Sequence, residues 1–156
     1  MPSIAKTAIR LLTECGMTVS TCESLTGGLI CATLVDVPGA SKVVRGGLIT
    51  YQTDTKTLLA GVDAGLIGQW GVVSAEVAQA MAEGARARLG TDIAISATGM
   101  ASPGGADEPP AGTVYVGVSS AKGVRAVGLT LSGDRQSIRR QTVEAAIAAI
   151  TEEIAR

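Results

Sequence analysis

The sequence predicts an α/β fold, a three-layer sandwich in which a mixed sheet lies between two layers of helices. Three observations predict it. Helical segments alternate with short apolar strands, two consecutive strands near the C-terminus form a hairpin pattern, and glycine or proline follows most elements. The length of 156 residues is that of one ordinary domain, so we expect a single domain over residues 1–156.

In the first part of the chain, residues 3–15 place their apolar side chains on one helical face, and Gly16 ends that helix. Residues 18–22 are a short strand. The uniformly apolar run 27–35 lies between two glycines and a Pro-Gly turn, which favours a buried helix.

The middle of the chain begins with a second strand, residues 45–51. Thr53 or Asp54 is then a suitable N-cap for a short helix. Residues 61–71 are punctuated by glycine and are expected to be an irregular connection. A helix is predicted over residues 74–90, because a capping serine precedes a periodic apolar pattern that a glycine ends.

The last part of the chain starts with an apolar strand, residues 92–97, and a long Gly- and Pro-rich loop, residues 98–112. Loops of this length inside a compact domain are usually functional or disordered. Residues 113–119 and 124–131 alternate as a hairpin, and residues 134–155 form a helix that Asp134 caps.

The composition argues against nucleic-acid and membrane partners. The 13 basic and 14 acidic residues give a net charge of −1, too little for a nucleic-acid or anionic-membrane footprint. No apolar run approaches the roughly 20 residues that a membrane helix needs. The N-terminus lacks the apolar core of a signal peptide. We therefore expect a soluble, cytoplasmic protein.

Three cysteines, Cys15, Cys22 and Cys31, make neither an even set nor a CxxC pair, so we expect no disulfide framework and no zinc site. We expect them to be small buried hydrophobic residues. The chain has no histidine, which removes the commonest metal ligand and excludes Ser-His and Cys-His catalytic pairs.

Polar side chains follow the strands where ligands usually bind. In open α/β sheets ligands bind beyond the carboxyl ends of the strands. The turn at Ser24, the segment from Tyr51 to Lys56 and the loop 98–112 each follow a predicted strand, so we expect them to share one rim.

Without histidine, a desolvated lysine is the best base for a serine nucleophile. Ser24 lies in a turn just before two glycines and a helix, where a developing oxyanion is well stabilised. Lys56 would be the base, and Tyr51 could relay the proton or hydrogen-bond the lysine. The alternative makes Ser24 a helix cap, Tyr51 a core aromatic and Lys56 a solvated surface charge.

The same residues resemble a known family, the nicotinamide-nucleotide amidases, also called the C-terminal domain of the competence/damage-inducible protein CinA. The run ESLTGG, from Glu23 to Gly28, is similar to that family's ESCTGG. Four further motifs follow in order: residues 38–41 resemble its P/A-G-A/S-S turn, residues 46–56 its R-G-x-x-x-Y-x-x-x-x-K segment, residues 98–114 its T/S-G-I-A-G-P-x-G-G…P-V-G-T-V loop, and residues 133–135 its G-D/N-R turn. Ser102 stands where glycine is common.

The resemblance implies hydrolysis of the carboxamide of nicotinamide mononucleotide to nicotinic acid mononucleotide and ammonia, in pyridine-nucleotide recycling. It implies Ser24 as nucleophile with Lys56 and Tyr51 as partners, and neither a cofactor nor a metal ion. It also implies an α/β/α sandwich with a mixed, mainly parallel five-stranded sheet and a homo-oligomer.

A wider set of residues is assigned to substrate binding. Arg135 would pair with the 5′-phosphate, which a guanidinium suits, or be one exposed charge among several. Glu23 would orient Ser24 or the substrate, or only stabilise the helix start. The glycines would bind through backbone N–H groups or serve turn geometry alone. The set is Glu23, Thr26, Gly27, Gly28, Thr98, Gly99, Gly104, Gly105 and Arg135.

A second hypothesis, from a different class, is a non-catalytic nucleotide-binding or assembly module that retains the pocket. Retention of Ser24, Tyr51 and Lys56 together argues against it, because binding alone does not need a base. Ammonia release from nicotinamide mononucleotide discriminates between the two.

Overall fold

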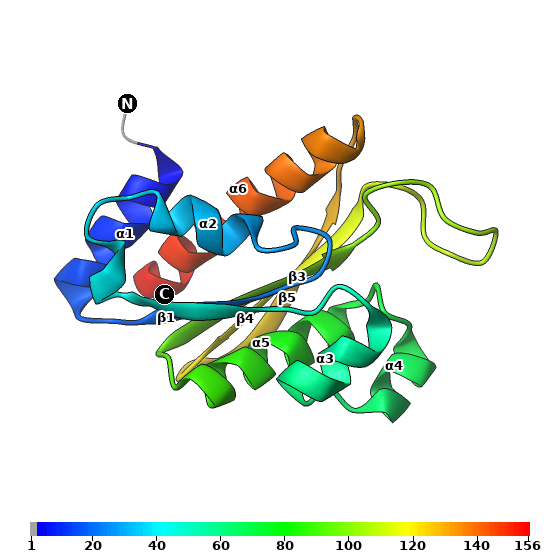
Figure 1. Ribbon diagram of the computed structural model, residues 1–156, viewed down its shortest axis with the longest axis horizontal. Coiled ribbons are helices and arrows are strands. Elements are labelled where there is room, and N and C mark those ends of the chain that lie inside the picture. Colours follow the sequence, from blue (N-terminus) through cyan, green and yellow to red (C-terminus); the bar gives the residue numbers. More distant parts are fainter. Residues whose placement is uncertain (1–2) are drawn as a thin grey trace.

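A computed structural model describes residues 3–156 as helices packed on both faces of one five-stranded sheet (Figure 1). Its strands lie in the order β2-β1-β3-β4-β5. β1 pairs in parallel with β2 and β3, whereas β4 pairs antiparallel with β3 and β5, so β4 alone runs against the others. The predicted mixed, mainly parallel sheet is confirmed. The strands are β1 (Val19–Glu23), β2 (Val44–Ile49), β3 (Ile93–Gly99), β4 (Thr113–Ser120) and β5 (Gly123–Thr130).

The helices form the two outer layers, as the sequence predicts. Figure 1 shows α1, α2 and α6 on one face of the sheet and α3, α4 and α5 on the other. A short 3-10 helix, η1 (Ala40–Lys42), leads into β2. The helices are α1 (Ile4–Cys15), α2 (Leu29–Val35), α3 (Thr53–Ala60), α4 (Ala64–Trp70), α5 (Ala75–Leu89) and α6 (Arg135–Ala155).

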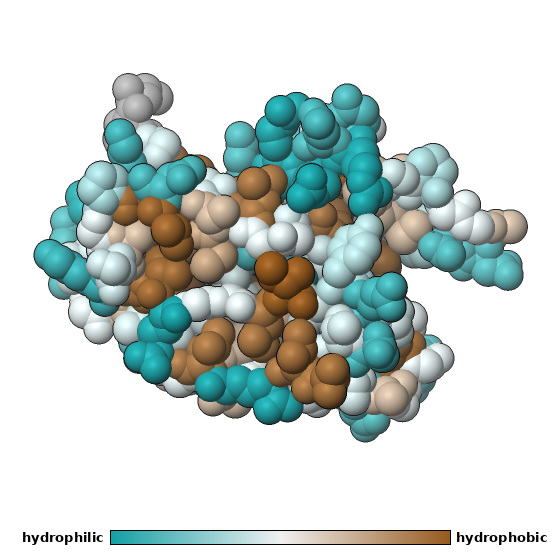
Figure 2. Space-filling view, viewed as in Figure 1, coloured by the Kyte–Doolittle hydropathy of each residue, from teal (hydrophilic) through white to brown (hydrophobic). Residues whose placement is uncertain are grey.

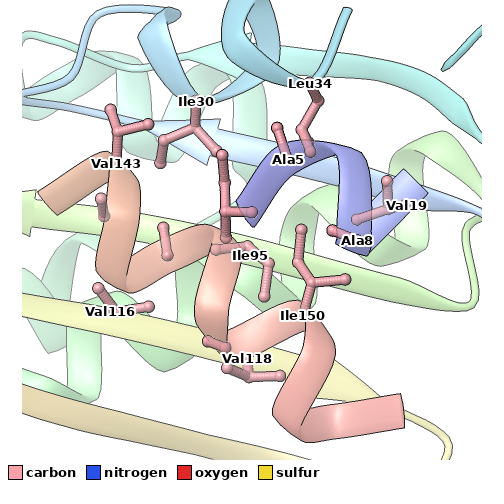
Figure 3. Close-up of a cluster of buried hydrophobic side chains, with 14 of the residues drawn as sticks. Ala5, Ala8, Val19, Ile30, Leu34, Ile95, Val116, Val118, Val143 and Ile150 are labelled. Atoms are coloured by element: carbon pink, nitrogen blue, oxygen red, sulfur yellow. The ribbon is translucent and has the colours of Figure 1, made fainter. Parts of the chain in front are cut away.

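Most of the core lies between the sheet and the layer of α1, α2 and α6. Figure 3 shows Ile30 of α2, Ile95 of β3 and Ile150 of α6 in this cluster, and all three are fully buried. A smaller cluster lies under α5, around Val77 and Met81. β3 is buried on both faces, which explains why its sequence is a nearly continuous apolar run.

One predicted connection is a helix. The expectation of an irregular segment over residues 61–71 is wrong, because α4 occupies most of it. Asp63 caps this helix, its carboxylate accepting a hydrogen bond from the Gly65 N–H at 2.8 Å. Gly65 and Gly68 lower the helix propensity of the segment and obscured the capping signal. Trp70 ends α4 and is half exposed.

Two predicted helix starts also differ. Gln52, without a side-chain hydrogen bond, is the N-cap of α3 in place of Thr53 or Asp54. α2 begins at Leu29, and its N-cap is Gly28, whose φ of +102° only glycine adopts readily. The alternative in which Ser24 is a helix cap is therefore wrong.

The surface carries exposed apolar side chains beside the sheet edge. Figure 2 shows hydrophobic atoms over the β2 edge and α3. Ile49 is 54% exposed and Leu58 is 73% exposed. Across residues 3–156, none of the helices has the length and hydropathy to span a bilayer. Met1 and Pro2, which belong to the predicted domain and N-terminal pattern, lie outside the described residues.

Candidate active site

The predicted rim forms at the carboxyl ends of β1, β2 and β3. The register aligns Glu23 of β1 with Ile49 of β2 and Ala97 of β3. Beyond this row the Thr50 N–H donates to the Glu23 carbonyl at 2.8 Å, and the Ser24 N–H donates to the Ala97 carbonyl at 3.0 Å. Thr50 and Ser24, the first residues after β2 and β1, are thus each tied to the neighbouring strand.

Lys56 and Ser24 meet at this rim. The Lys56 Nζ atom lies 3.0 Å from the Ser24 Oγ atom, 2.7 Å from the Thr50 carbonyl oxygen and 3.4 Å from the Tyr51 carbonyl oxygen. Ser24 Oγ lies 3.4 Å from the same Tyr51 oxygen. The sequence pattern did not single out Thr50, because a backbone carbonyl has no sequence signature.

The short helix α3 buries its lysine and exposes its leucines. Lys56 has an exposed fraction of 0%, whereas Leu58 lies on the outer side. The alternative of a solvated Lys56 is therefore wrong. α3 packs closely on α5 at Gly84, where a Cβ atom would overlap the Ala60 carbonyl, and this close approach holds α3 against α5.

Burial lowers the pKa of the Lys56 amine below its ordinary value, because a charged amine loses its hydration there. Within residues 3–156, no carboxylate lies within ion-pair distance of Lys56. The nearby Cys22 thiol is also fully buried, and burial raises its pKa to about 11. That thiol is neutral near pH 7 and cannot hold the lysine in its charged form.

Glu23 stabilises the start of α2. Its carboxylate accepts from the N–H groups of Ile30 and Cys31 at 2.8 and 2.9 Å, and from the Thr21 hydroxyl at 3.0 Å. The carboxylate is 1% exposed. These contacts favour the alternative in which Glu23 only stabilises the helix start. The N-terminus of α2, which was expected to stabilise an oxyanion, is thus already occupied by the Glu23 carboxylate.

The Tyr51 side chain turns away from the Ser24 and Lys56 pair. Its hydroxyl accepts from Arg135 Nη2 at 2.9 Å, and Arg135 Nη1 donates to the Ser102 hydroxyl at 3.0 Å. Tyr51 is 57% exposed, so the core-aromatic alternative is wrong. Tyr51 contacts Lys56 through the Tyr51 backbone carbonyl and not, as the sequence predicted, through its phenol. The predicted contact through the phenol is therefore wrong.

The remaining predicted site residues occupy different settings. Thr98 is buried and donates its hydroxyl to the Val72 carbonyl at 2.9 Å. Gly99 packs against Val114, where a Cβ would not fit. Gly104 and Gly105 are exposed in the loop that projects from the body after β3 (Figure 1). Their roles in substrate binding stay predictions.

Arg139 was missed by the sequence analysis. From α6 it donates to the Leu25 carbonyl at 2.9 Å and to the Thr26 carbonyl at 3.0 Å. These two hydrogen bonds fasten α6 to the turn that contains Ser24. Arg139 lies four positions after the motif arginine Arg135, so helical spacing places both near the same end of α6.

A cavity of about 870 Å³ is lined mainly by residues of α3 and α4, and neither Ser24 nor Lys56 is part of its wall. Tyr51, Asp54, Thr57 and Leu58 contribute to its wall. Tyr51 also contacts the catalytic candidates through its carbonyl, so the cavity and the pair share one residue.

The cysteines are not all buried. Cys15 is exposed and Cys31 half-buried, so the expectation of three buried thiols is correct for Cys22 only. In the part of the chain that the structure describes, no three His, Cys, Asp or Glu side chains group together to hold a metal ion.

Comparison with known proteins agrees with the fold. The family profile described as the CinA C-terminal domain matches residues 1–154. A CinA-like protein of Geobacter metallireducens is 43% identical over 146 residues, which is 93% of this chain and 35% of that protein. The chain spans about a third of the length of the curated relatives it matches.

Two solved structures are similar over almost their whole length. A CinA superfamily protein from Klebsiella pneumoniae has a TM-score of 0.93 and 30% identity, covering 97% of this chain and 96% of that one. A competence/damage inducible protein from Agrobacterium tumefaciens has a TM-score of 0.90 and 33% identity, covering 100% and 98%. The chain therefore belongs to the CinA C-terminal domain family.

Proposed function

We propose that this chain is a nicotinamide-nucleotide amidase, which hydrolyses the carboxamide of nicotinamide mononucleotide to nicotinic acid mononucleotide and ammonia. Ser24 is the nucleophile and Lys56 the general base. The observation that supports this most is the 3.0 Å contact between Lys56 Nζ and Ser24 Oγ at a lysine with no exposed surface.

The three oxygen atoms around Lys56 Nζ can accept the three N–H groups of an ammonium, and they can equally serve a neutral amine, which the proposed reaction needs. A neutral amine has two N–H donors and one lone pair, whereas an ammonium has three donors and no lone pair. The carbonyl groups of Thr50 and Tyr51 accept the two N–H groups. The lone pair is then left for the Ser24 hydroxyl proton, which is the arrangement that a base and nucleophile need.

In the first half of the reaction, Ser24 Oγ attacks the carboxamide carbon while its proton passes to the Lys56 amine. The carbonyl electrons move onto oxygen and form a tetrahedral oxyanion. As the oxyanion collapses, the C–N bond breaks and Lys56 returns the proton to the leaving nitrogen. Ammonia departs, and an ester joins the nicotinoyl carbon to Ser24.

In the second half, a water molecule attacks the ester carbon and gives one proton to Lys56. The bond from carbon to Ser24 Oγ then breaks, and Lys56 returns that proton to Ser24. The products are nicotinic acid mononucleotide and the starting enzyme, so one water is consumed for each ammonia released.

The substrate assignment rests on the family resemblance and is supported by the charge at the rim. Arg135 is exposed and held by the Tyr51 hydroxyl and Ser102. Its guanidinium is a suitable partner for the 5′-phosphate of a mononucleotide. Glu23, being engaged at α2, is not needed in this proposal.

The test is ammonia release from nicotinamide mononucleotide by the purified chain, measured beside Ser24→Ala. Ammonia in amounts equal to nicotinic acid mononucleotide, lost in the variant, supports the proposal. Nucleotide binding without ammonia release in the wild type would favour the non-catalytic binding module.

We also propose that the chain forms a homo-oligomer through the β2 edge and α3. Ile49, Leu58 and Leu59 expose apolar surface there, which an interface would bury (Figure 2). Leu58→Glu should reduce the molar mass in light scattering to that of a monomer. An unchanged mass would place the interface elsewhere.

A further inference from the structure

The carbonyl groups of the nucleophile and of the two residues after it are each held by at least one hydrogen bond. The Ser24 carbonyl accepts from the Gly27 N–H at 3.1 Å. The Leu25 and Thr26 carbonyls accept from Arg139 Nε and Nη2 at 2.9 and 3.0 Å. The Thr26 carbonyl also accepts from the Leu29 N–H at 3.0 Å, whereas the hydrogen bond to the Leu25 carbonyl comes from Arg139, 114 residues further along the chain.

Holding a carbonyl also fixes the direction of the N–H on the same peptide group. The peptide bonds here are trans, so each N–H points opposite to its C=O. The Thr26 N–H shares a peptide group with the Leu25 carbonyl and therefore points away from Arg139. Among residues 3–156, neither the Leu25 N–H nor the Thr26 N–H has a hydrogen-bond acceptor.

A third polar group of the turn is also unused. Thr26 is fully buried, and its hydroxyl oxygen has no hydrogen-bond partner within the described chain. Buried polar atoms without partners are rare in folded proteins, and they often mark a ligand position. Unused groups thus gather in the two residues that directly follow Ser24.

We infer that Arg139 is a positioning residue, which holds the Leu25 carbonyl and so directs the Thr26 N–H at the oxyanion formed when Ser24 is the nucleophile. The Leu25 N–H is the second donor, and its direction is fixed by the hydrogen bond from the Gly27 N–H to the Ser24 carbonyl. For its natural substrate the inference rests on the proposed function. Preorganised backbone donors of this kind often make the largest single contribution to acyl-transfer catalysis.

The fork of an arginine suits this role. Its planar guanidinium offers several N–H donors in fixed directions, so it spans two adjacent carbonyls, whereas the single ammonium of lysine cannot hold both in the same geometry. Arg139 touches no reacting atom and acts only through the backbone. A loss of alignment in such a site lowers the rate roughly 10- to 100-fold without removing the nucleophile.

The test uses a fluorophosphonate probe, which reports on Ser24 independently of the nucleotide substrate. Ser24 Oγ bonds to phosphorus, the P–F bond breaks, fluoride leaves, and the serine proton passes to Lys56. The phosphonyl oxygen occupies the same oxyanion position. Arg139→Lys and Arg139→Met are compared with Arg140→Lys and Arg140→Met, because Arg140 is the adjacent and exposed arginine on α6.

Labelling of Ser24 is followed by mass spectrometry for both rate and final extent. We expect the Arg139 variants to label to the wild-type extent at a rate at least about 10-fold lower, while the Arg140 variants match wild type. A merely structural role would lower the extent, because a misfolded fraction never reacts, and would leave the rate unchanged. That result, or a wild-type rate in both Arg139 variants, would overturn the inference.

A second readout separates this inference from the proposed function. With nicotinamide mononucleotide, the Arg139 variants should lose kcat and keep KM within a few-fold. Wild-type labelling at Ser24 without ammonia release would overturn the substrate assignment, and the labelling rates would still decide on Arg139. Absence of any wild-type labelling at Ser24 would overturn the nucleophile and this inference together.

Discussion

The Nζ atom of Lys56 lies 3.0 Å from the Oγ atom of Ser24, and Lys56 has no exposed surface. A lysine in water is protonated at neutral pH. Here burial favours the neutral amine, and two backbone carbonyls accept its hydrogens. The pair thereby couples a hydroxyl to a base in a chain without histidine.

Ser24→Ala should fold normally and lose turnover by roughly four orders of magnitude or more, the usual consequence of removing a nucleophile. Ser24 caps no helix, so the substitution removes only the hydroxyl contacts with Lys56 and the Tyr51 carbonyl. Thermal unfolding should give a Tm close to wild type, while ammonia release falls to background.

Cys22→Ala is the matched control for this experiment. Cys22 is the other candidate nucleophile, but it is fully buried and its pKa is raised to about 11. The control should keep most of its turnover. If Ser24→Ala stays active and Cys22→Ala does not, the nucleophile is Cys22.

Lys56→Arg should bind nucleotide and be nearly inactive, because arginine stays protonated in proteins. The wild-type rate should fall on the acid side of its pH profile as the lysine becomes protonated, at a pH below the ordinary lysine pKa. Circular dichroism checks that the larger side chain is accommodated. Substantial turnover with an unchanged pH profile would mean that Lys56 supplies only positive charge.

The fold was largely predictable because its signals are local. The helical period of residues 74–90 and the alternation of the C-terminal hairpin appear as α5 and β4 with β5, displaced by a residue or two. α4 was missed because two glycines hid its capped start. Strand order was not predictable from such signals, since it depends on packing between distant segments.

The site was predictable in its residue types and less so in its contacts. The absence of histidine and the turn around Ser24 predicted that Lys56 is the base. The structure buries Lys56, as a desolvated base requires, and exposes Leu58; which side of α3 is covered depends on its docking against α5. The contacts of the Thr50 carbonyl and of Arg139 join segments that no sequence spacing relates.

Exhaustive chelation should leave turnover unchanged. The proposed steps need only Ser24, Lys56 and water, and no metal ion takes part in activating the nucleophile. Activity after treatment with a strong chelator and gel filtration is compared with activity in untreated enzyme. Loss of turnover that one divalent ion restores would contradict the metal-free mechanism.

Tyr51→Phe should raise KM for nicotinamide mononucleotide about 5-fold and leave kcat nearly unchanged, since it removes one hydrogen bond of about 1 kcal/mol to Arg135. Tyr115→Phe is the control, because it is the other tyrosine of the chain. Nicotinamide riboside, which lacks the phosphate, should show no change. A large loss of kcat would instead mean that the Tyr51 phenol takes part directly in proton transfer.

Ser102→Gly tests the second support of Arg135 and introduces the glycine that is common in the family motif. Ser102 is the acceptor of Arg135 Nη1 at 3.0 Å. We expect a few-fold rise in KM for the phosphorylated substrate alone. A similar rise with the riboside would mean that the substitution disturbs the loop 98–112 and not the guanidinium.

Comparison of the wild type with Lys56→Met should show the lowered pKa of Lys56 in the pH dependence of the free energy of unfolding. The native pKa of Lys56 lies below the unfolded value of about 10.4, so between these two values the unfolded chain binds more protons than the native one. In that window the free energy of unfolding of the wild type rises with pH, whereas the variant lacks this contribution.

The measurement is denaturant unfolding of both proteins from about pH 6 to about pH 10.5, the upper limit being set by the ordinary lysine pKa. The free energy of unfolding of the wild type minus that of Lys56→Met should increase through the window and level off near the unfolded pKa. Subtraction cancels the other titrating groups, which both proteins share. A difference that stays constant throughout would mean that Lys56 keeps its ordinary pKa in the folded chain, and a lysine protonated at neutral pH could not take the proton of Ser24.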